Sequence, residues 1–443
     1  MMRKRMMSGE HLRTLRRVMH EITTPGTRDI ARWGTLMGGI LAIACGGSQP
    51  APASSPPPTS GVLLGAEPEI KALPAMDVEP ATTPPAPAVN PFEGAEFYRD
   101  PEYAKKVEST PTDDPAIKAL LEKVKKTPTA LWLDRIAAIE QIPVWLKDVK
   151  RQAKAAGKPV VPVFVVYDMP NRDCAAKASA GELDAEQGGE QRYRTEFIDP
   201  IAKYFAADPE QRIVVVLEPD SLANMATNLG VEKCARSQNI YKHSSAYAIA
   251  KLSMPNVFIY MDAAHAGWLG WASNRGRAAD VFAEVLEMAG GPDRIRGFAT
   301  NVSNYNALEG DWGKKLESSN PTPNELAYVD GLAETLAAKG ITGKGYIVDT
   351  SRNGVQESRK IWGSWCNVAA AGLGPRPQIA PRPPVDAYFW VKPPGDSDGI
   401  SDPSAARFDE NCQSVDAAPN APEAGQWFPE QFLKMLERAN PPF

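Results

Sequence analysis

Six apolar runs lie along residues 161–391, and each ends abruptly in polar, acidic or aromatic residues. Runs without polar alternation are typical of parallel strands that are buried on both faces. The runs are Val161–Val166, Val214–Leu217, Val257–Met261, Ile295–Thr300, Tyr346–Val348 and Val385–Val391. Helix-compatible stretches separate several of them, namely Gln191–Phe205, Ser245–Leu252 and Ala278–Met288. This alternation predicts an α/β fold with a mainly parallel sheet, and the spacing suits a barrel.

Two carboxylates separated by one proline follow the run Val214–Leu217. Parallel strands meet with their C-terminal ends on one rim, where α/β proteins place their chemistry. Glu218 and Asp220 are therefore expected at a site, with Pro219 fixing the backbone between them. The alternative is that Asp220 caps the helix that follows, as an aspartate in this position often does.

The other strand ends add more carboxylates, together with cations and indoles. The acidic residues are Asp173, Asp262, Asp349, Asp396 and Asp398, and the others are Arg172, Lys392, Trp268, Trp271 and Trp365. Carboxylates beside indoles indicate carbohydrate, because sugar rings stack on flat rings and sugar hydroxyls need polar partners. The i, i+3 spacing of Trp268 and Trp271 would set both indoles on one side of a helical turn. Packing in the core is the alternative for any one of these tryptophans.

Cleavage of a glycoside needs one acid and one base or nucleophile. The acid must keep its proton near neutral pH, so burial or a like charge must raise its pKa. Asp220 is the candidate acid, and Asp173 could supply the like charge. Serine hydrolysis is disfavoured, because no Gly-x-Ser-x-Gly is present and His265 is the only histidine at a strand end, where it could equally be structural. Nucleotide-binding motifs of the Gly-x-Gly-x-x-Gly or P-loop type are also missing from these positions.

The composition changes along the 443 residues. Eleven of the 41 prolines fall between Gly46 and Asn90, which predicts an extended, unpacked linker over 46–90. Residues 91–443 have a globular composition and are expected to form one catalytic domain. The net charge is −5 and the folded part carries no basic stripe, which argues against nucleic acid as a partner.

The first 45 residues predict export. Basic residues within Arg3–Arg32 precede the apolar stretch Trp33–Ala44, which is too short to span a bilayer. Ala42–Cys45 resembles a bacterial lipobox, in which Cys45 would become lipidated and tether the protein to a membrane surface. The alternative is a plain export signal with an incidental cysteine. We therefore expect a protein that is secreted or lipid-anchored at the bacterial cell surface.

The four remaining cysteines fit an exported protein and allow three pairings. The simplest joins Cys174 to Cys234 and Cys366 to Cys412, since each pair would link neighbouring loops at one end of the sheet. Four free thiols or a metal site are the alternatives. Zinc is disfavoured because no Cys-x-x-Cys occurs and histidine is scarce, so we predict no metal and no cofactor.

In their order, these segments resemble glycoside hydrolase family 6, the cellobiohydrolases and endoglucanases that cut β-1,4-glucan. The matching segments are Val166–Cys174, Leu217–Asn224, Tyr260–Trp271, Arg296–Tyr305, Trp365–Val368, Trp390–Pro393 and Ala421–Trp427. The resemblance covers about 91–443. It implies a distorted (β/α) barrel with about seven parallel strands and an inverting mechanism without a cofactor.

The resemblance also implies a role for individual residues. Asp220 would be the general acid, and Asp173 would hold its proton in place and help to relay one from water. Tyr167 would crowd the distorted sugar, and Ser179 would hold the attacking water. Asp398 matches the position proposed as base, with a chain of waters as the alternative. In an inverting enzyme the two carboxyls should stand roughly 6.5–9.5 Å apart.

Further positions match residues that bind the glucan chain or form disulfides in the family. The sugar-stacking positions are Trp132, Trp268, Trp271 and Trp365, and the hydrogen-bonding positions are Asp134, His265, Asn304, Lys392 and Asp396. The family's two disulfides match the simple pairing given above. Asp396 stands where cellobiohydrolases usually have glutamate, so its reach is one methylene shorter.

Two loops roof the cleft in exo-acting members of the family, and endo-acting members lose much of them. The segment Asp396–Cys412 is full length, as in the exo type. We therefore expect a monomeric cellobiohydrolase that releases cellobiose from the non-reducing ends of a β-1,4-glucan chain. An endoglucanase with an open cleft and an inactive glucan-binding lipoprotein are the alternatives.

Overall fold

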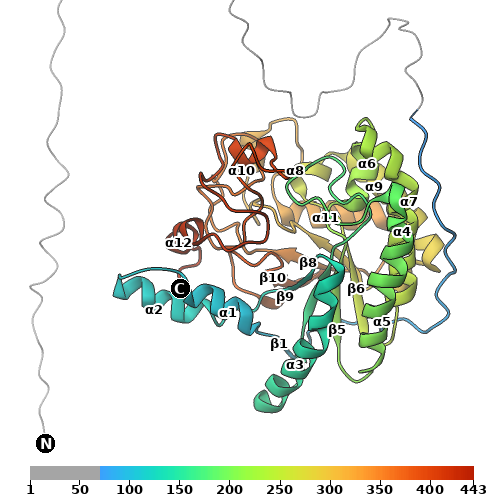
Figure 1. The fold of residues 1–443 in the computed structure, drawn as a ribbon, viewed down its shortest axis with the longest axis horizontal. Helices are drawn as coiled ribbons and strands as arrows, with labels where there is room; N and C mark the ends of the chain where they lie inside the picture. Colours follow the sequence, from blue (N-terminus) through green and yellow to red (C-terminus); the bar gives the residue numbers. More distant parts are fainter. Residues whose placement is uncertain (1–69) are drawn as a thin grey trace, which may run out of the picture. The chain divides into compact units, whose positions relative to one another are not determined.

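The computed structural model describes residues 70–443, which form a curled, mostly parallel sheet with helices packed around it (Figure 1). The sheet has eight strands in the order β2-β4-β5-β6-β7-β8-β10-β9, and only β9 runs antiparallel to its neighbour. The strands are β2 (Leu131–Leu133), β4 (Val163–Val166), β5 (Ile213–Leu217), β6 (Val257–Asp262), β7 (Gly297–Thr300), β8 (Gly345–Asp349), β9 (Gln378–Arg382) and β10 (Val385–Phe389). Seven parallel strands confirm the predicted α/β barrel class.

A backbone hydrogen bond links the two outermost parallel strands of the curled sheet, β2 and β10. The backbone N–H of Ala130, just before β2, donates to the carbonyl of Trp390, just after β10, at 3.1 Å. Successive residues of each strand face opposite sides, as the pleat of a strand requires. Val214 and Val216 of β5 lie in the apolar cluster enclosed by the sheet, and Val215 lies in the cluster between the sheet and the helices. Both faces are thus buried, which explains the unbroken apolar runs.

One predicted strand is divided in two. The run Val161–Val166 contains Pro162, which cannot donate a hydrogen bond to a neighbouring strand. The structure has β3 (Val160–Val161) before it and β4 after it, and β3 pairs with the short β1 (Glu96–Phe97) in a separate sheet. The single predicted strand is therefore wrong, although the expected rim position of its C-terminal end is right.

Twelve α-helices are assigned in residues 70–443, and they cover the outside of the sheet and its C-terminal rim. The helices are α1 (Pro101–Glu108), α2 (Pro115–Val124), α3 (Ile142–Ala156), α4 (Gly189–Arg192), α5 (Asp199–Ala206), α6 (Ser221–Thr227), α7 (Glu232–Leu252), α8 (Ala266–Leu269), α9 (Ala272–Ala289), α10 (Trp312–Leu316), α11 (Glu325–Ala337) and α12 (Pro429–Glu437). The predicted helical stretches lie within α4–α5, α7 and α9. A π-helical turn, η3 (Tyr193–Ile198), separates α4 from α5, so the first stretch is not one regular helix.

Residues 70–90, which we call the strap, contain no helix or strand, yet they pack against the rest of the domain. In Figure 1 the strap is the blue segment that runs beside α7. Its Leu73 N–H donates to the Arg236 carbonyl in α7 at 2.7 Å, and its Ala81 N–H donates to the Ala289 carbonyl at the end of α9 at 3.2 Å.

A buried ion pair fixes the middle of the strap. Arg194 and Glu190 are 2.6 Å apart, and both side chains are less than one-tenth exposed. The carboxylate of Glu190 accepts the Met76 N–H at 3.0 Å, while Arg194 donates to the carbonyls of Met76 and Asp77 at 2.7 Å. The final part of the predicted linker is therefore docked on the domain. The rest of it, the predicted export signal and Cys45 lie outside the described residues.

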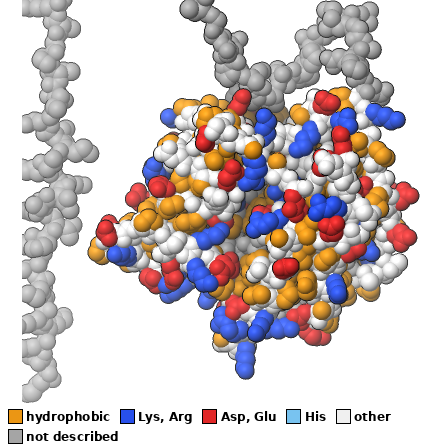
Figure 2. Space-filling model, in the orientation of Figure 1, with side chains coloured by type: hydrophobic (Ala, Val, Ile, Leu, Met, Phe, Trp, Pro, Cys, Tyr) orange, Lys and Arg blue, Asp and Glu red, His pale blue; other side chains and the backbone are white. Residues whose placement is uncertain are grey.

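The structure contains the two disulfides Cys174–Cys234 and Cys366–Cys412, which confirms the simple pairing. Positive and negative side chains are interspersed on the face shown in Figure 2. Within residues 70–443, no helix combines the length and the apolar character needed to cross a membrane.

Candidate active site

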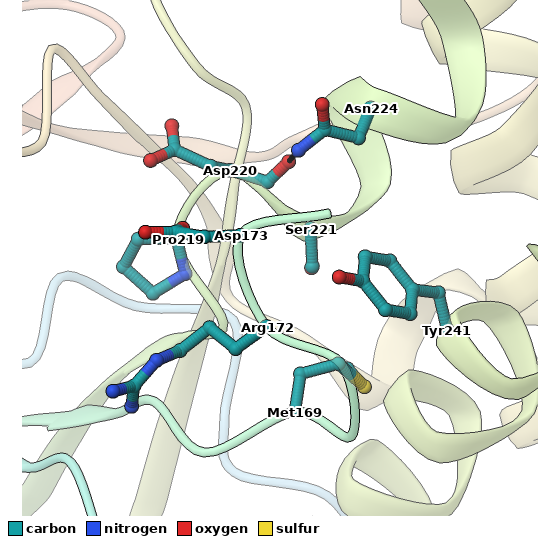
Figure 3. Close-up of a pocket in the computed structure, with 8 residues that line it drawn as sticks. All are labelled: Met169, Arg172, Asp173, Pro219, Asp220, Ser221, Asn224 and Tyr241. Carbon is teal, nitrogen blue, oxygen red and sulfur yellow. Dashed lines mark hydrogen bonds between the residues drawn. The ribbon is translucent and has the colours of Figure 1, made fainter. Parts of the chain in front are cut away.

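Asp220 and Asp173 follow neighbouring strands and lie together on the rim of the sheet (Figure 3). Both have left-handed backbone conformations, with φ of +65° for Asp220 and +56° for Asp173. Such conformations strain a residue with a Cβ and are found at active sites, where the surrounding structure maintains them. Asp220 occupies the position before α6, yet its side chain accepts no capping hydrogen bond. The capping alternative is therefore wrong, and the carboxyl is free to act elsewhere.

The surroundings of Asp220 favour its protonated form. Burial and the nearby carboxylates of Asp262 and Asp173 raise the pKa of Asp220 well above its ordinary value. Asp262 also accepts the backbone N–H of Asp220 at 2.9 Å, and burial raises the pKa of Asp262 to about 7. A carboxyl that holds its proton at neutral pH can serve as a general acid.

Asp173 is held by two donors from its own loop. It accepts the Tyr167 hydroxyl at 2.9 Å and the backbone N–H of Ser179 at 3.0 Å. Burial and the charge of Asp173 together raise the pKa of the Tyr167 hydroxyl, which therefore stays protonated. The structure thus brings Asp220, Asp173, Tyr167 and Ser179 together, as the sequence predicts.

Arg172 organises the same loop from behind. Its guanidinium lies 4.2 Å from the centre of the Tyr167 ring. It donates to the carbonyl of Ser179 at 2.7 Å, to that of Asp134 at 2.8 Å and to that of Tyr167. Arg172 therefore ties the loop that carries Asp173 to the strand ends. The sequence places Arg172 at the rim, but only the structure gives it this role.

Asp398 lies in a different environment, where donors surround the carboxylate. Arg352 donates to both of its oxygens at 2.7 and 2.8 Å, and the Arg352 side chain is completely buried. The Tyr305 hydroxyl at 2.6 Å and the Asn367 N–H at 2.9 Å donate to the second oxygen. Burial alone would raise the pKa of Asp398, but Arg352 and then Lys392, 3.8 Å away, hold that pKa below its ordinary value.

The tryptophans expected to stack on sugars line the rim as separate groups. Trp132 meets the Tyr167 ring edge-on at 5.6 Å, and the Lys392 ammonium lies 5.5 Å from the Trp132 ring. Trp365 packs against the disulfide Cys366–Cys412. Both indoles are only partly buried, which leaves surface for a ligand.

Trp268 and Trp271 do not share a helical turn, because α8 ends at Leu269. Trp268 donates from its indole N–H to Thr227 Oγ1 at 2.7 Å and packs partly against the core. Trp271 precedes α9 and meets the ring of Trp362 edge-on at 6.0 Å. The expected placement of both indoles on one helical turn is therefore wrong. Trp271 instead packs beside Trp362, a residue that no sequence pattern selects.

The remaining predicted sugar-binding residues are polar groups with defined partners. His265 Nε2 lies 3.0 Å from the Asn304 amide nitrogen, and burial and Arg359 lower the pKa of His265 to about 3, so the ring is neutral. Asp134 pairs with the exposed Arg135 at 3.1 Å. Asp396 accepts from Lys106 of α1 at 2.8 and 2.9 Å.

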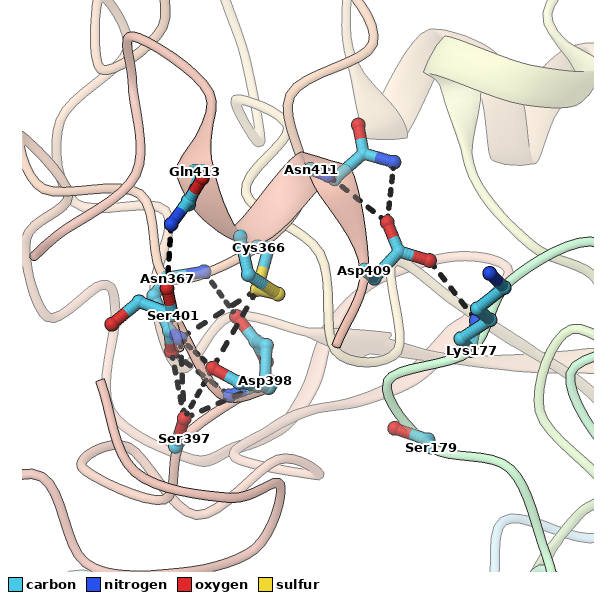
Figure 4. The surroundings of a disulfide bond; sticks show 12 residues. Lys177, Ser179, Cys366, Asn367, Ser397, Asp398, Ser401, Asp409, Asn411 and Gln413 are labelled. Atoms are coloured by element: carbon cyan, nitrogen blue, oxygen red, sulfur yellow. Dashed lines mark hydrogen bonds between the residues drawn. A yellow bond between two sulfur atoms is a disulfide. The ribbon is translucent and has the colours of Figure 1, made fainter. Parts of the chain in front are cut away.

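The loop after β4 and the loop after β10 are distant in sequence but meet at the rim. The backbone N–H of Lys177 donates to the carboxylate of Asp409 at 3.0 Å, as Figure 4 shows. Beside this contact, Ala178 packs against the disulfide Cys366–Cys412. The loop that carries Asp173 is thus joined to the loop that carries Asp398.

The rim contains several functional residues that the sequence analysis did not select. Arg352 lies three residues after β8, so the strand-end signal that selected Asp220 and Asp262 could have found it. Lys106, Tyr305 and Trp362 carry no such signal, because they reach the rim from a peripheral helix and from loops. The described residues contain no cluster of histidine, cysteine, aspartate or glutamate that could hold a metal ion.

Comparison with known proteins identifies the family. The sequence profile of the glycosyl hydrolases family 6 matches residues 92–439. The chain belongs to glycosyl hydrolase family 6. The family match therefore covers the sheet, its helices and the whole rim, and begins after the strap.

Several relatives are similar over most of the chain. A 1,4-β-D-glucan cellobiohydrolase C of Emericella nidulans is 43% identical over 364 residues, which cover 80% of this chain and 79% of that protein. A putative endoglucanase type B of Fusarium oxysporum is 41% identical, with 80% and 77% of the two chains covered. The first of these relatives is named a cellobiohydrolase and the second a putative endoglucanase, so relatives of this chain include proteins named for exo and for endo action.

Solved structures of the family have the same fold. Cellobiohydrolase II (Cel6A) of Humicola insolens, in complex with glucose and cellotetraose, has a TM-score of 0.77 at 42% identity, covering 80% of this chain and all of that chain. The CcCel6A catalytic domain complexed with p-nitrophenyl β-D-cellotrioside has a TM-score of 0.78 at 43% identity, with 80% and 99% covered. These matches confirm the distorted barrel that the resemblance implies.

Proposed function

We propose that this protein is an inverting cellobiohydrolase that cuts β-1,4-glucosidic bonds and releases cellobiose from the non-reducing ends of glucan chains. The observation that carries the hydrolase assignment is the pair Asp220 and Asp173, one protonated carboxyl beside one hydrogen-bonded carboxyl, on the rim of a family 6 barrel. Cello-oligosaccharides bound to related structures support glucan as the substrate class.

Asp220 acts as the general acid that protonates the glycosidic oxygen as the bond breaks. Its proton is retained at neutral pH because the site is buried and because Asp262 and Asp173 would repel a second negative charge. Tyr167 and Ser179 keep Asp173 in place through its two hydrogen bonds, so this negative charge stays close to the acid. As the leaving sugar departs, Asp220 becomes the anion.

Water attacks the anomeric carbon from the opposite face, which inverts its configuration. We assign Ser179 to orient this water, since its backbone is fixed by Asp173 and Arg172. Asp398 is a poor direct base, because the buried Arg352 and then Lys392 hold its pKa below the ordinary value. Donors from Arg352, Tyr305 and Asn367 stabilise the carboxylate further. The proton of the attacking water therefore leaves through a second water, and Asp398 supplies a fixed negative charge.

The contact between the two rim loops favours exo action. The hydrogen bond from Lys177 to Asp409 and the packing of Ala178 on the Cys366–Cys412 disulfide join the loops on either side of the site. A glucan chain must then enter by its end, since loops that touch leave no open side for a chain interior. The relative named as an endoglucanase makes endo action the competing outcome.

The deciding experiment follows the products from cellohexaose and amorphous cellulose by proton NMR at early times. Cellobiose released as the α-anomer, with few new reducing ends in the insoluble fraction, is the expected result for an inverting exo-enzyme. Mixed oligomers with many insoluble reducing ends would replace this assignment with an endoglucanase. A protein that binds glucan but does not cleave it would contradict the assignment of hydrolase activity.

We also propose that the protein is exported and lipid-anchored through Cys45. Two disulfides support an oxidising compartment, where such bonds persist. The basic and apolar segments before Cys45 support the export signal. Metabolic labelling with a fatty acid, compared between the protein and its Cys45→Ser variant, tests the anchor; equal labelling of the two would exclude Cys45.

A further inference from the structure

We infer that Lys106 is a positioning residue that orients Asp396 for sugar binding. This inference rests on the proposed function and on the glucan hydrogen bond that the family resemblance implies for Asp396. Lys106 lies on α1, far from the rim in sequence, and its ammonium is 2.8 Å and 2.9 Å from the two oxygens of Asp396. One cation therefore contacts the whole carboxylate.

The backbone that carries Asp396 is fixed by close packing. Gly395 has a φ of +102°, and a Cβ built on it would lie 2.2 Å from an atom of the Trp427 ring. Phe428 N–H donates to the Gly395 carbonyl at 2.7 Å. A larger residue at Gly395 would need both a left-handed conformation and a displaced indole, so the turn before Asp396 has little freedom.

The same face of α1 docks on this turn through a second residue. The Tyr103 hydroxyl donates to the Pro394 carbonyl at 3.3 Å, and the Tyr103 ring meets Trp427 edge-on at 6.2 Å. Tyr103 and Lys106 are three positions apart, so both side chains leave the helix on one side. The helix therefore holds the backbone of the turn with Tyr103 and the side chain of Asp396 with Lys106.

The ion pair between Lys106 and Asp396 is better suited to orienting the carboxylate than to stabilising the fold. The side chain of Asp396 is 10% exposed, but that of Lys106 is 39% exposed, and ion pairs with one exposed partner contribute little to folding. Each carboxylate oxygen has two lone pairs, so contact with Lys106 leaves acceptors free for sugar hydroxyls. Asp396 has a shorter side chain than the usual glutamate of cellobiohydrolases, so its orientation matters more for reaching a ligand.

The test compares Lys106→Met with the parent and with Lys105→Met on cellotetraose and cellohexaose. Lys105 is the neighbouring lysine of α1 and is exposed. Within residues 70–443 it pairs only with Glu102 of the same helix, so it provides a matched control. We expect Lys106→Met to raise KM about three- to tenfold, with kcat within twofold and the melting temperature unchanged. Lys106→Arg should restore most of the binding, and Lys105→Met should leave both parameters as in the parent.

A second comparison shows whether Lys106 acts through Asp396. In an Asp396→Asn background, Lys106→Met should add almost nothing to KM, because coupled residues give non-additive effects. The inference is overturned by an unchanged KM in Lys106→Met, or by the same fold-change in both backgrounds. Cleavage of cellohexaose by the parent is measured in the same series, so failure of the proposed function would appear there as inactivity of every protein.

Discussion

Asp220 and Asp398 belong to the same rim, yet their carboxyl groups have opposite surroundings. Asp220 has other carboxylates nearby, and its side chain accepts no capping hydrogen bond from α6. Asp398 has two cations and two further donors around it. Both are buried, and burial alone favours the protonated form of either. The local charges decide the outcome, since they add to the effect of burial at Asp220 and reverse it at Asp398.

Because of this difference, two aspartates on one rim are suited to two tasks, proton donation and the provision of a fixed negative charge. A carboxyl that keeps its proton can donate it to a leaving group, whereas a carboxylate paired with a buried arginine is a fixed charge. The pair also shows why position at a strand end does not by itself define a catalytic role.

Removing the acid should produce the largest loss. For Asp220→Asn we expect kcat on cellohexaose to fall by about 10²–10⁴-fold, since proton transfer to the leaving group contributes on that scale. KM should stay within about threefold, because the polar side chain is kept in place. A dinitrophenyl cellobioside, whose leaving group needs little protonation, should show a much smaller loss of kcat. Equal losses on both substrates would mean that Asp220 does not act as the acid.

Breaking the ion pair should mainly affect stability. Asp398→Asn leaves the Arg352 cation buried without its anionic partner, which we expect to reduce the free energy of unfolding by about 3–5 kcal/mol. Asp402→Asn is the control, because Asp402 lies in the same loop but is exposed. Denaturant unfolding measures both variants. A stable Asp398→Asn protein that has lost activity, and that forms a glycosyl azide when azide is added, would instead identify Asp398 as the direct base.

The carboxylates near Asp220 should affect how kcat/KM depends on pH. Asp220 is active when protonated, so kcat/KM should fall as pH rises through the raised pKa of Asp220. Asp262→Asn removes one negative charge, makes ionisation of Asp220 easier and lowers its pKa. The alkaline limb of the profile should therefore move to lower pH by about one unit or less. An unmoved limb would show that the charge of Asp262 does not influence the acid.

The smallest effect should come from removing one of the donors around Asp398. Tyr305→Phe deletes two hydrogen bonds, the one that Tyr305 donates to Asp398 and the one that it accepts from Arg352. The direct hydrogen bonds of Arg352 and Asn367 to Asp398 stay in place. We expect a loss of about 1–2 kcal/mol in the free energy of unfolding and a change in kcat within fewfold. A loss as large as that of Asp398→Asn would mean that Tyr305, and not Arg352, controls this carboxylate.

Sequence patterns predicted the strands well because each apolar run is long enough to be buried on both faces. The run that failed contains Pro162. The strand β2 was missed because it has only three residues, and β9 was missed because none of its residues is buried and it contains Pro381. The strap was taken for part of a linker, since its proline-rich composition resembles that of an unpacked chain. Its packing depends on backbone hydrogen bonds to α7 and α9 and on the buried pair of Glu190 and Arg194, which composition does not reveal.

The candidate site could be predicted as far as it lies on strand ends. Asp173 and Asp220 come directly after apolar runs, so their meeting at one rim follows from the parallel sheet. The partners of Asp398 could not be derived in this way, because Tyr305 and Asn367 come from separate loops whose paths the pattern does not specify. The opposite pKa shifts of Asp220 and Asp398 also require three-dimensional neighbours, since residue type and spacing are similar for both.

The strap has a practical consequence for anyone who wishes to produce the catalytic part alone. A recombinant protein started at Phe92, where the family profile begins to match, would lack the backbone groups of Met76 and Asp77 that Glu190 and Arg194 bind. It would expose an ion pair and helix surfaces that the intact chain covers. Starting the gene before residue 70 keeps this covering, and it would keep proteases from reaching α7 and α9 at the same place.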